Sequence, residues 1–395
     1  MTSRPPLQQR SLPGALYGAP DRFAEEQQRI FRRRWVYVCN ESDLPRVGSH
    51  VCLDLADDSV VVVRAEAGVR AFHNVCRHRG TRLCWSERGH QPKALVCPYH
   101  AWAFSFDGEL IGAPNFDPES VPGFSRDDYA LLPVAVAVVE GLVFVHLGDD
   151  PSAAPPVGKA LPHLAERVRP WDPARLVAVE RRSYEVPANW KLFFQNYSEC
   201  YHCPSAHPAL NRLTPYLDSS NDLDEGAMLG GPMRLRDGVA SMSATGAACA
   251  APLQGLDPDR RRGVWYYTVF PNLFLSLHPD YLLVHRIDAL EQDRTRIECA
   301  WYFAPESATR DDFDPTPAVE FWDQTNRQDW ELCRQAHRGV TSRAYVPGPY
   351  AAIESTVAAF DREYLRAMGL GMEDLGQDLG RGGARSPADE AAERS

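Results

Sequence analysis

The chain has 395 residues, of which 44% are hydrophobic and 24% charged, and its formal net charge is −11. This length allows more than one hydrophobic core, so we expect two domains or one large composite domain. The negative charge argues against nucleic acid or an anionic membrane as a partner. The N-terminal stretch lacks the apolar core of a signal peptide and no apolar run could span a membrane, so we expect a cytoplasmic protein.

The first predicted element is an amphipathic helix over residues 21–35. Apolar side chains recur there at helical spacing, at Phe23, Ile30, Phe31 and Trp35. We therefore treat residues 1–35 as an N-terminal helical segment.

An all-β domain is predicted over residues 36–150. Short β-branched or apolar runs alternate there with turns rich in Gly, Asp and Pro, and the runs include Val60–Val63, Ala94–Cys97 and Leu142–Leu147. Glu140-Gly141 interrupts the longest apolar stretch and predicts a turn between two strands. A Pro-rich stretch over residues 149–173 marks the domain boundary.

Residues 151–375 form the second predicted domain, which mixes strands and helices. Period-two alternation predicts strands over residues 177–186 and 281–287, and helix formers over residues 317–338 predict a long C-terminal helix. The tail over residues 376–395 is rich in Gly and charged residues, and we expect it to be disordered.

Two short motifs in the first domain, Cys76-Arg-His78 and Cys97-Pro-Tyr-His100, each supply one thiolate and one imidazole. Two Cys and two His also suit a structural zinc site, which is the alternative. Zinc fingers usually pair like ligands in each loop, whereas each loop here is mixed. Mixed loops can place both Cys on one iron and both His on the other, which is the ligation of a Rieske [2Fe–2S] cluster.

The sequence around these motifs resembles the Rieske domain of ring-hydroxylating oxygenase large subunits. Arg79-Gly80 follows the first His and Ala101-Trp102 the second, as in that family. The resemblance implies cluster ligation by Cys76, His78, Cys97 and His100. No role is assigned to three neighbouring histidines, His50, His73 and His90.

A second motif indicates a mononuclear metal centre. Glu199 and His202 are three residues apart, so on a helix they would share one face. Pro204 and Pro208 would end that helix and let His207 return to the same metal. Two His and one carboxylate form the facial triad of non-haem Fe(II) oxygenases.

The resemblance continues through this motif and reaches about residue 370. Four parts of this region match the oxygenase pattern in order and spacing: the segment NWK, Asn196, Tyr201-His202 and His207-Pro208. This implies His202 and His207 as iron ligands, with a carboxylate from a late helix. We choose Asp329 and keep Asp323, or a position near Asn326, as alternatives.

The family assigns a further role to the position of Glu199. In a homotrimer, a carboxylate there links the Rieske His100 of one subunit to His202 of the next and orients both imidazoles. Glu199 and Asn196 are therefore the predicted catalytic residues.

The resemblance also implies a fold and partners. The fold is α+β, with an N-terminal Rieske β-domain and a helix-grip-like catalytic domain whose antiparallel sheet surrounds a long C-terminal helix. The expected cofactors are the [2Fe–2S] cluster and mononuclear Fe(II), which together activate O2. The chain contains no G-x-G-x-x-G and no plant-type ferredoxin motif, so we expect an NAD(P)H-dependent flavin/ferredoxin reductase as partner.

The Glu199-Cys-Tyr-His-Cys context is similar to the choline, glycine betaine, stachydrine and carnitine branch of the family. Such enzymes hydroxylate next to a quaternary nitrogen, and hydroxylation of an N-methyl group leads to demethylation. A cation pocket needs aromatic faces, for which the candidates are Phe194, Trp265, Tyr266 and Tyr267. The alternatives are oxygenation of an aromatic or other apolar ring, and a non-catalytic Rieske electron carrier.

The chain contains 10 cysteines, and without a secretion signal we expect no disulfide framework. Six of them lie outside the motifs and are expected to be structural: Cys39, Cys52, Cys84, Cys249, Cys299 and Cys333.

Overall fold

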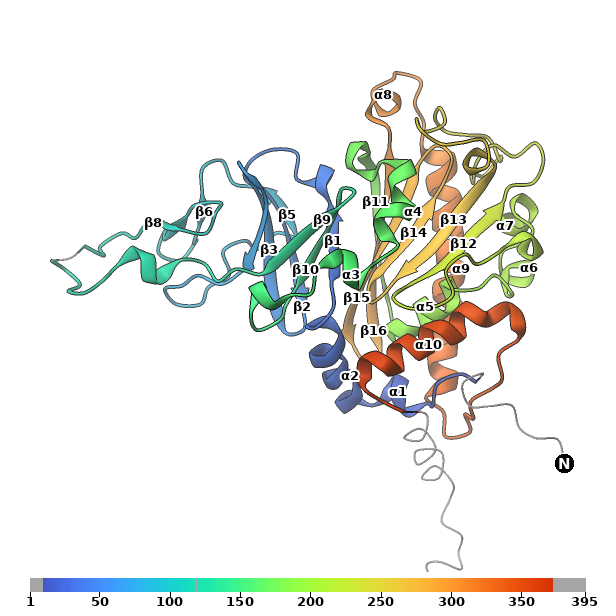
Figure 1. Ribbon diagram of the computed structural model, residues 1–395, viewed down its shortest axis with the longest axis horizontal. Coiled ribbons are helices and arrows are strands. Elements are labelled where there is room, and N and C mark those ends of the chain that lie inside the picture. The colour runs from blue at the N-terminus through green and yellow to red at the C-terminus, as the bar shows by residue number, and fades with distance from the viewer. Residues whose placement is uncertain (1–9, 118, 372–395) are drawn as a thin grey trace, which may run out of the picture.

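The computed structural model describes residues 10–117 and 119–371. A narrow β-rich part lies beside a larger part that carries the long helices (Figure 1). The tail predicted to be disordered, residues 376–395, lies outside the described residues. Within the described ranges, no helix is both long enough and apolar enough to cross a membrane.

The N-terminal segment folds into short helices, which are α1 (Ala15–Gly18), α2 (Pro20–Glu26) and a π-helix (Gln27–Phe31). The predicted helix over residues 21–35 is correct in type, but the chain turns after Phe31 to enter the first strand. Pro20 starts α2, where its missing N–H costs no hydrogen bond. Phe31 packs edge-on against Trp190 of the second domain, with ring centroids 5.3 Å apart.

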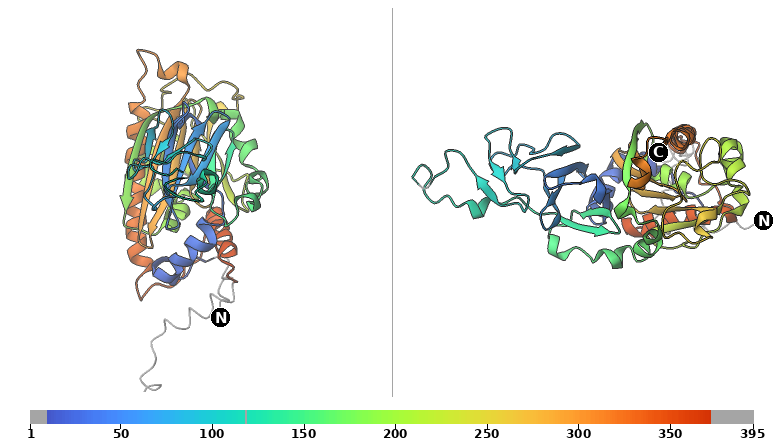
Figure 2. Two further views of the ribbon diagram at one scale, coloured as in Figure 1. Left: turned by 90° about the vertical axis from the view of Figure 1, so that its left-hand side faces the viewer. Right: turned by 90° about the horizontal axis from the view of Figure 1, so that it is seen from above.

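Three antiparallel sheets make up the first domain, with strand orders β1-β10-β9, β4-β3-β2-β5 and β6-β7-β8. The strands are β1 (Val36–Asn40), β2 (Ser49–Leu55), β3 (Asp58–Ala65), β4 (Gly68–His73), β5 (Arg88–His90), β6 (Leu95–Val96), β7 (Ala103–Phe104), β8 (Leu110–Gly112), β9 (Ala135–Val139) and β10 (Leu142–His146). The all-β prediction is confirmed, and Glu140-Gly141 forms the predicted turn, with positive φ at both residues. The sheet β6-β7-β8 lies toward the free end of the molecule (Figures 1 and 2).

The second domain is built on one six-stranded antiparallel sheet with the order β11-β16-β15-β14-β13-β12. Its strands are β11 (Val177–Val186), β12 (Met228–Arg234), β13 (Gly263–Val269), β14 (Leu273–Leu277), β15 (Leu282–Glu291) and β16 (Arg294–Phe303). Short helices α3 (Val157–Ala160) and α4 (Leu164–Val168) connect the two domains. The α+β fold predicted from the resemblance is confirmed.

The helices of the second domain include the two longest in the described chain. They are α5 (Trp190–Tyr197), α6 (Cys203–Ala206), α7 (Pro208–Leu213), α8 (Pro305–Ala308), α9 (Thr316–Val340) and α10 (Ser355–Met368). α9 confirms the long helix predicted over residues 317–338, and it buries Phe321, Trp322 and Trp330. α10 was not predicted, and its buried Phe360 stacks on Phe194 of α5 at 5.0 Å.

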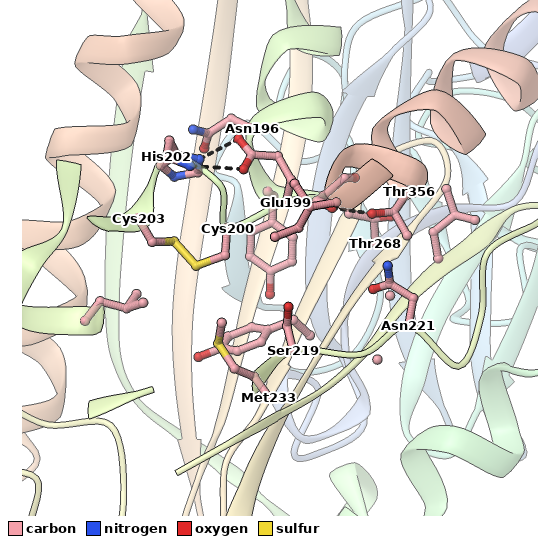
Figure 3. A pocket seen from close by; sticks show the side chains of 18 of the residues that line it. Asn196, Glu199, Cys200, His202, Cys203, Ser219, Asn221, Met233, Thr268 and Thr356 are labelled. Atoms are coloured by element: carbon pink, nitrogen blue, oxygen red, sulfur yellow. Dashed lines mark hydrogen bonds and ion pairs between the residues drawn. A yellow bond between two sulfur atoms is a disulfide. The ribbon is translucent and has the colours of Figure 1, made fainter. Parts of the chain in front are cut away.

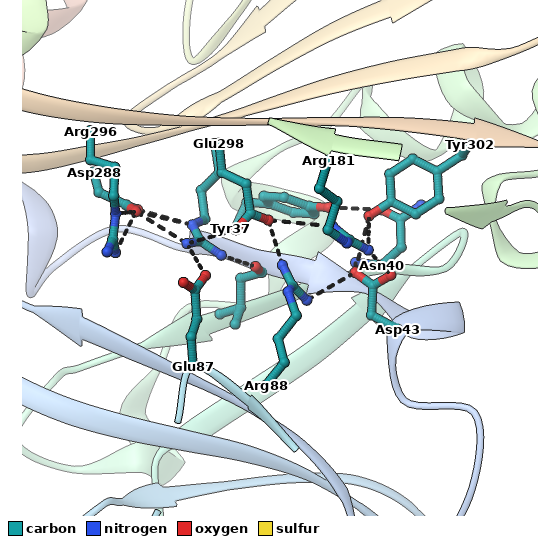
Figure 4. A network of polar contacts seen from close by, with 12 residues as sticks. Tyr37, Asn40, Asp43, Glu87, Arg88, Arg181, Asp288, Arg296, Glu298 and Tyr302 are labelled. Atoms are coloured by element: carbon teal, nitrogen blue, oxygen red, sulfur yellow. Dashed lines mark hydrogen bonds and ion pairs between the residues drawn. The ribbon is translucent and has the colours of Figure 1, made fainter. Parts of the chain in front are cut away.

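A network of ion pairs joins the two domains (Figure 4). Arg286 of β15 is fully buried, donates to the Val38 carbonyl at 3.0 Å and pairs with Glu87 at 2.8 Å. Arg88 of the first domain pairs with Glu298 of β16. A buried guanidinium is tolerated only when its donors are matched, so the network fixes how the domains meet.

Candidate metal centres and the adjoining cavity

Two turns of the same design carry the cluster motifs. The N–H groups of Cys76 and Cys97 each donate to a carbonyl five residues later, both at 2.8 Å. The N–H groups of Gly80 and Ala101 donate back to those cysteines' carbonyls, both at 3.0 Å, and both residues have positive φ. Glycine adopts this conformation at no steric cost, so the Gly in the first motif has a backbone role.

The four predicted cluster donors come together beside the sheet β6-β7-β8 of the first domain. The rings of His78 and His100 lie 4.7 Å apart, and the thiols of Cys76 and Cys97 are buried near one another. Burial raises the pKa of Cys76 to about 11. The Nδ1 atoms of both histidines are buried and have no hydrogen-bond partner in the described chain. Such orphaned atoms are costly, so the donor set fits a bound metal cluster.

The segment between α5 and α7 is not the helix that was predicted. α5 ends at Tyr197, and Glu199 Oε2 then accepts the N–H groups of Tyr201 and His202. A carboxylate that bonds nearby backbone N–H groups competes with the helix. Pro204 and Pro208 lie in the first turns of α6 and α7, where proline is tolerated, so they begin helices instead of ending one.

A disulfide between Cys200 and Cys203 closes this turn and was not expected from the sequence. The six cysteines predicted to be structural are all free thiols, four of them buried and two half-buried.

Three of the predicted iron ligands converge at one point. His207 Nε2 lies 2.7 Å from Asp329 Oδ1, and His202 Nε2 lies 3.2 Å from the same oxygen. One donor atom from each of the three residues falls within 4.8 Å of the other two. Two imidazoles and one carboxylate with a shared focus suit non-haem iron.

Other side chains fix the orientation of these donors. His202 Nδ1 bonds Glu199 Oε1 at 2.6 Å, and His207 Nδ1 bonds Gln328 Oε1 at 2.8 Å. Asn196 of α5 donates to Asp329 Oδ1 at 3.1 Å. Partners of this kind set the tautomer and ring direction of metal-binding histidines. No sequence motif points to Gln328, which belongs to the site only because α9 places it beside Asp329.

The electrostatics of the three donors are those of a preformed ion-pair site. Burial would raise the pKa of Asp329, but the hydrogen bonds from His202 and His207 lower it to about 2. Burial would lower the pKa of His202, but Asp329 and Glu199 raise it to about 10. A divalent cation would replace the imidazole protons in this arrangement.

The alternative carboxylate, Asp323, lies elsewhere on α9. It accepts from the Tyr184 hydroxyl at 2.5 Å and pairs with Arg182 at 3.1 Å and Arg327 at 2.8 Å. Asn326, the other alternative position, contacts His285 at 3.2 Å in the core. The structure therefore brings only Asp329, among the three candidates, to His202 and His207.

A cavity of about 870 Å³, counted with its opening to solvent, adjoins the three donors. In Figure 3, His202 and Glu199 lie on one side of this space, and Ser219 and Met233 lie on the opposite side. The walls come from α5, α7, α9, α10, β12, β13 and the loop before β12. A small organic molecule in this cavity would contact the metal position.

Only one of the four predicted pocket aromatics lines this cavity, and it is Tyr266. Its strand neighbours Trp265 and Tyr267 point to the opposite face of the sheet, because successive side chains alternate. Phe194 is buried among core aromatics on the far side of α5. The structure instead supplies Tyr197 and Trp322, which were not predicted as pocket residues.

Comparison with known families assigns both domains. Residues 34–133 match the Rieske [2Fe-2S] domain, and residues 173–370 match the catalytic domain of the ring hydroxylating alpha subunit. Together these matches span both metal centres described above.

Individual relatives are similar over most of the chain. A glycine betaine monooxygenase oxygenase subunit from Chromohalobacter salexigens is 32% identical over 370 residues, which cover 86% of this chain and 82% of the relative. A carnitine monooxygenase oxygenase subunit from Escherichia coli is 37% identical over 204 residues, covering 51% and 53%. The crystal structure of the quaternary ammonium Rieske monooxygenase CntA superposes with a TM-score of 0.78 at 25% identity, covering 91% of this chain and 95% of that one.

Proposed function

Because the chain belongs to the family of Rieske ring-hydroxylating oxygenase alpha subunits, we propose that it hydroxylates an N-methyl group of a quaternary ammonium compound. The family has two cofactors, a [2Fe–2S] cluster and mononuclear iron. The proposed cluster ligands are Cys76, His78, Cys97 and His100. The proposed iron ligands are His202, His207 and Asp329. The proposed substrate class follows from the relatives named for glycine betaine and carnitine.

The observation that carries this proposal is that one donor atom from each of His202, His207 and Asp329 converges at the wall of a cavity. A metal held by these two His and one Asp would have room for further ligands, because the cavity adjoins all three donors. Bound iron supplies O2 reduction chemistry there, with a second electron from the cluster. A substrate in the cavity would therefore meet the reactive position directly.

The chain's own residues orient and protect this site. Glu199 and Gln328 hold the Nδ1 atoms of His202 and His207, so each ring presents Nε2 to the metal position. Asn196 donates to the Asp329 oxygen on which both Nε2 atoms converge, which limits rotation of that carboxylate. Apolar side chains such as Leu210, Leu229 and Trp322 form part of the remaining wall.

The overall reaction balances with two external electrons. One oxygen atom enters a C–H bond of the N-methyl group, and the other leaves as water with two electrons and two protons. The hydroxymethyl ammonium product then loses a proton and releases formaldehyde, leaving a tertiary amine. As an oxygenase subunit the chain needs a reductase partner, and we propose that this partner takes its electrons from NAD(P)H.

A trimer would connect the two metal centres. Within one chain the cluster loops and the cavity lie at opposite ends, and the interdomain network keeps them apart (Figure 1). We propose that His100 of one subunit approaches Glu199 of the next, whose carboxylate already bonds His202. A structure of another quaternary ammonium Rieske monooxygenase was described in terms of inter-subunit electron transfer, which supports this arrangement.

A second candidate function is oxygenation of an aromatic or other apolar ring. The aliphatic side chains in the cavity, such as Leu229, Met233 and Ile353, favour it. A pure electron carrier is disfavoured, because it would need no such cavity beside a second metal set.

The test uses iron-loaded protein, a chemical reductant and a panel of N-methylated ammonium compounds and aromatic hydrocarbons. The proposal predicts one formaldehyde for each O2 consumed with at least one ammonium compound. Diol or phenol formation without formaldehyde would favour the second candidate. O2 uptake that no compound increases would favour electron transfer alone.

A further inference from the structure

The described residues that line the cavity beside the proposed iron site include two histidines, His202 and His207, but no long basic side chain. Among the described residues that line it, none is Lys or Arg, and Glu199 and Asp329 supply its carboxylates. The two histidines are already paired with Asp329, so a substrate carboxylate buried there would find no free cationic side chain, and burial of an unpaired charge is costly. The cavity is therefore unfavourable for the anionic half of a zwitterion. This consequence for the substrate rests on the function proposed above.

The entrance to the cavity is acidic. Ser219, Ser220 and Asn221 line the cavity and are exposed, so the loop that carries them forms the opening. Four acidic residues and no Lys or Arg occur in this loop, at Asp218, Asp222, Asp224 and Glu225. Asp222 faces Arg167 at 3.4 Å, and the other three are exposed. Such a rim attracts cations and repels anions.

Aromatic rings form one wall of the cavity. Tyr266 stands at 77° to Tyr197 and at 65° to Trp322, with ring centroids 6.1 Å and 6.2 Å apart. The three rings meet at a corner, and the faces of such rings are electron-rich. A methylated ammonium group is attracted to faces of this kind.

Two hydroxyl groups of the lining residues have no partner. Ser198 Oγ and Tyr266 Oη are buried and form no hydrogen bond within the described residues. An unsatisfied buried hydroxyl costs free energy that a ligand can recover. A hydroxyl or amide on the ligand can bond either group without bringing in a charge.

From these features we propose that the substrate is a net cation: a methylated ammonium compound whose other polar group is neutral, such as an amino alcohol. Glycine betaine and carnitine, for which relatives are named, both carry a carboxylate. On this proposal the chain discriminates against them. The acidic rim, the aromatic corner and the lack of Lys or Arg among the lining residues all favour a cationic substrate over a zwitterion.

Choline and glycine betaine test this inference directly, because they differ only in a neutral hydroxymethyl group against a carboxylate. Holoenzyme with both centres loaded is reduced with dithionite and mixed with O2 and each compound, and formaldehyde is measured. Binding is measured separately by calorimetry. We expect choline to bind and turn over at least about tenfold better, since tenfold needs only ~1.4 kcal/mol of differential binding.

A charge added at the entrance sharpens the test. Asn221→Arg places a cation at the opening and should narrow or reverse the preference. Gln324→Arg adds the same charge on α9 at an exposed position that does not line the cavity, and it should leave the preference unchanged.

The outcomes separate the two claims. Formaldehyde from glycine betaine at an equal or higher rate than from choline would overturn this inference and leave the proposed function standing. A preference for choline that survives Asn221→Arg unchanged would also count against the charge argument. Formaldehyde from no ammonium compound would overturn both.

Discussion

The proposed cluster loops and the proposed iron site each contain two histidines, but the ring nitrogens of the two pairs have different partners. At the cluster loops the Nδ1 atoms of His78 and His100 are buried and unpartnered among the described residues. At the iron site the Nδ1 atoms of His202 and His207 are bonded to Glu199 and Gln328, and Nε2 is the inward atom. At both sites the nitrogen proposed for the metal has no partner, among the described residues, outside the proposed ligand set: the iron-site Nε2 atoms contact Asp329, which is itself a proposed ligand.

This difference shows two ways to prepare a metal site. The cluster donors are positioned mainly by the backbone, through two equivalent turns whose hydrogen bonds start at the cysteines. The iron donors are positioned by side chains that reach in from α5 and α9. Substitutions near the cluster should therefore act through loss of the ligand itself, whereas the iron site should respond in graded steps to its supporting residues.

The largest expected effect is loss of the cluster. Cys97→Ala removes one proposed thiolate, so the visible absorption of the cluster and at least about 1,000-fold of the turnover should be lost. The mononuclear iron should stay bound, since its donors lie in the other domain. Cys249→Ser, at a half-buried free thiol, is the control and should keep the spectrum. A Cys97→Ala protein with an intact Rieske spectrum would disprove the ligand assignment.

Glu199→Gln should have the next largest effect. The amide keeps an oxygen that can accept from His202 Nδ1 but loses the charge that supports the imidazole. We expect both metals to remain bound and steady-state turnover to fall about 100-fold. Glu185→Gln, at an exposed position of β11, should retain full activity. Near-normal turnover by the Glu199 variant would contradict its proposed role between the two centres.

Gln328→Ala should weaken the iron site without destroying it. The His207 ring would lose the acceptor at its Nδ1, and iron affinity should fall by about tenfold. Competition with a chelator measures this change. Gln324→Ala, one turn away on the exposed side of α9, is the matched control. Equal chelator resistance in the two variants would show that Gln328 does not orient the ligand.

The last expected effect is on folding stability and not on the metals. It concerns Asp361, a carboxylate that hydrogen-bonds a side chain of α5. Asn196 donates to Asp329, while its neighbour Gln195 donates to Asp361 of α10 at 2.7 Å. Burial raises the pKa of Asp361 to about 7, whereas Asp329 has imidazole partners that lower its pKa. The folded state therefore binds an extra proton between about pH 4 and 7, and stability is lost as pH rises through 7.

Asp361→Asn should remove this pH dependence. The variant should be more stable than the parent at pH 8 by on the order of 2 kcal/mol, with little difference at pH 5. Urea unfolding at both values measures it, with exposed Asp127→Asn as the control. A difference that does not change with pH would mean that Asp361 is ionised throughout the range.

Site residues that are close together in the chain could be predicted from the sequence, and those that distant elements bring to the site could not. Cys76 and His78, or His202 and His207, are close in the chain, so local spacing already suggests a shared metal. Asp329 lies over a hundred residues later and could be chosen only through family resemblance. Gln328 and Trp322 reach the site because α9 packs across the sheet, and no local pattern carries that information.

Two local predictions failed for physical reasons that the sequence does contain. The helix predicted through Glu199 and His202 does not form, because the Glu199 carboxylate accepts hydrogen bonds from the backbone N–H groups of Tyr201 and His202, which a continuing helix would use. Trp265, Tyr266 and Tyr267 were all predicted to line the pocket. Because side chains alternate along a strand, Trp265 and Tyr267 lie on the opposite face of the sheet from Tyr266. The second error came from treating neighbours in sequence as neighbours in space.

The central claim is that one chain holds two metal centres with separate ligand sets. The most direct measurement is the ratio of iron to acid-labile sulfide in anaerobically loaded protein, compared between the parent, Asp329→Ala and Asp323→Ala. We expect about three irons for two sulfides in the parent and in Asp323→Ala, and about two for two in Asp329→Ala. A parent with only two irons, or an Asp329→Ala protein that keeps the third, would contradict the account.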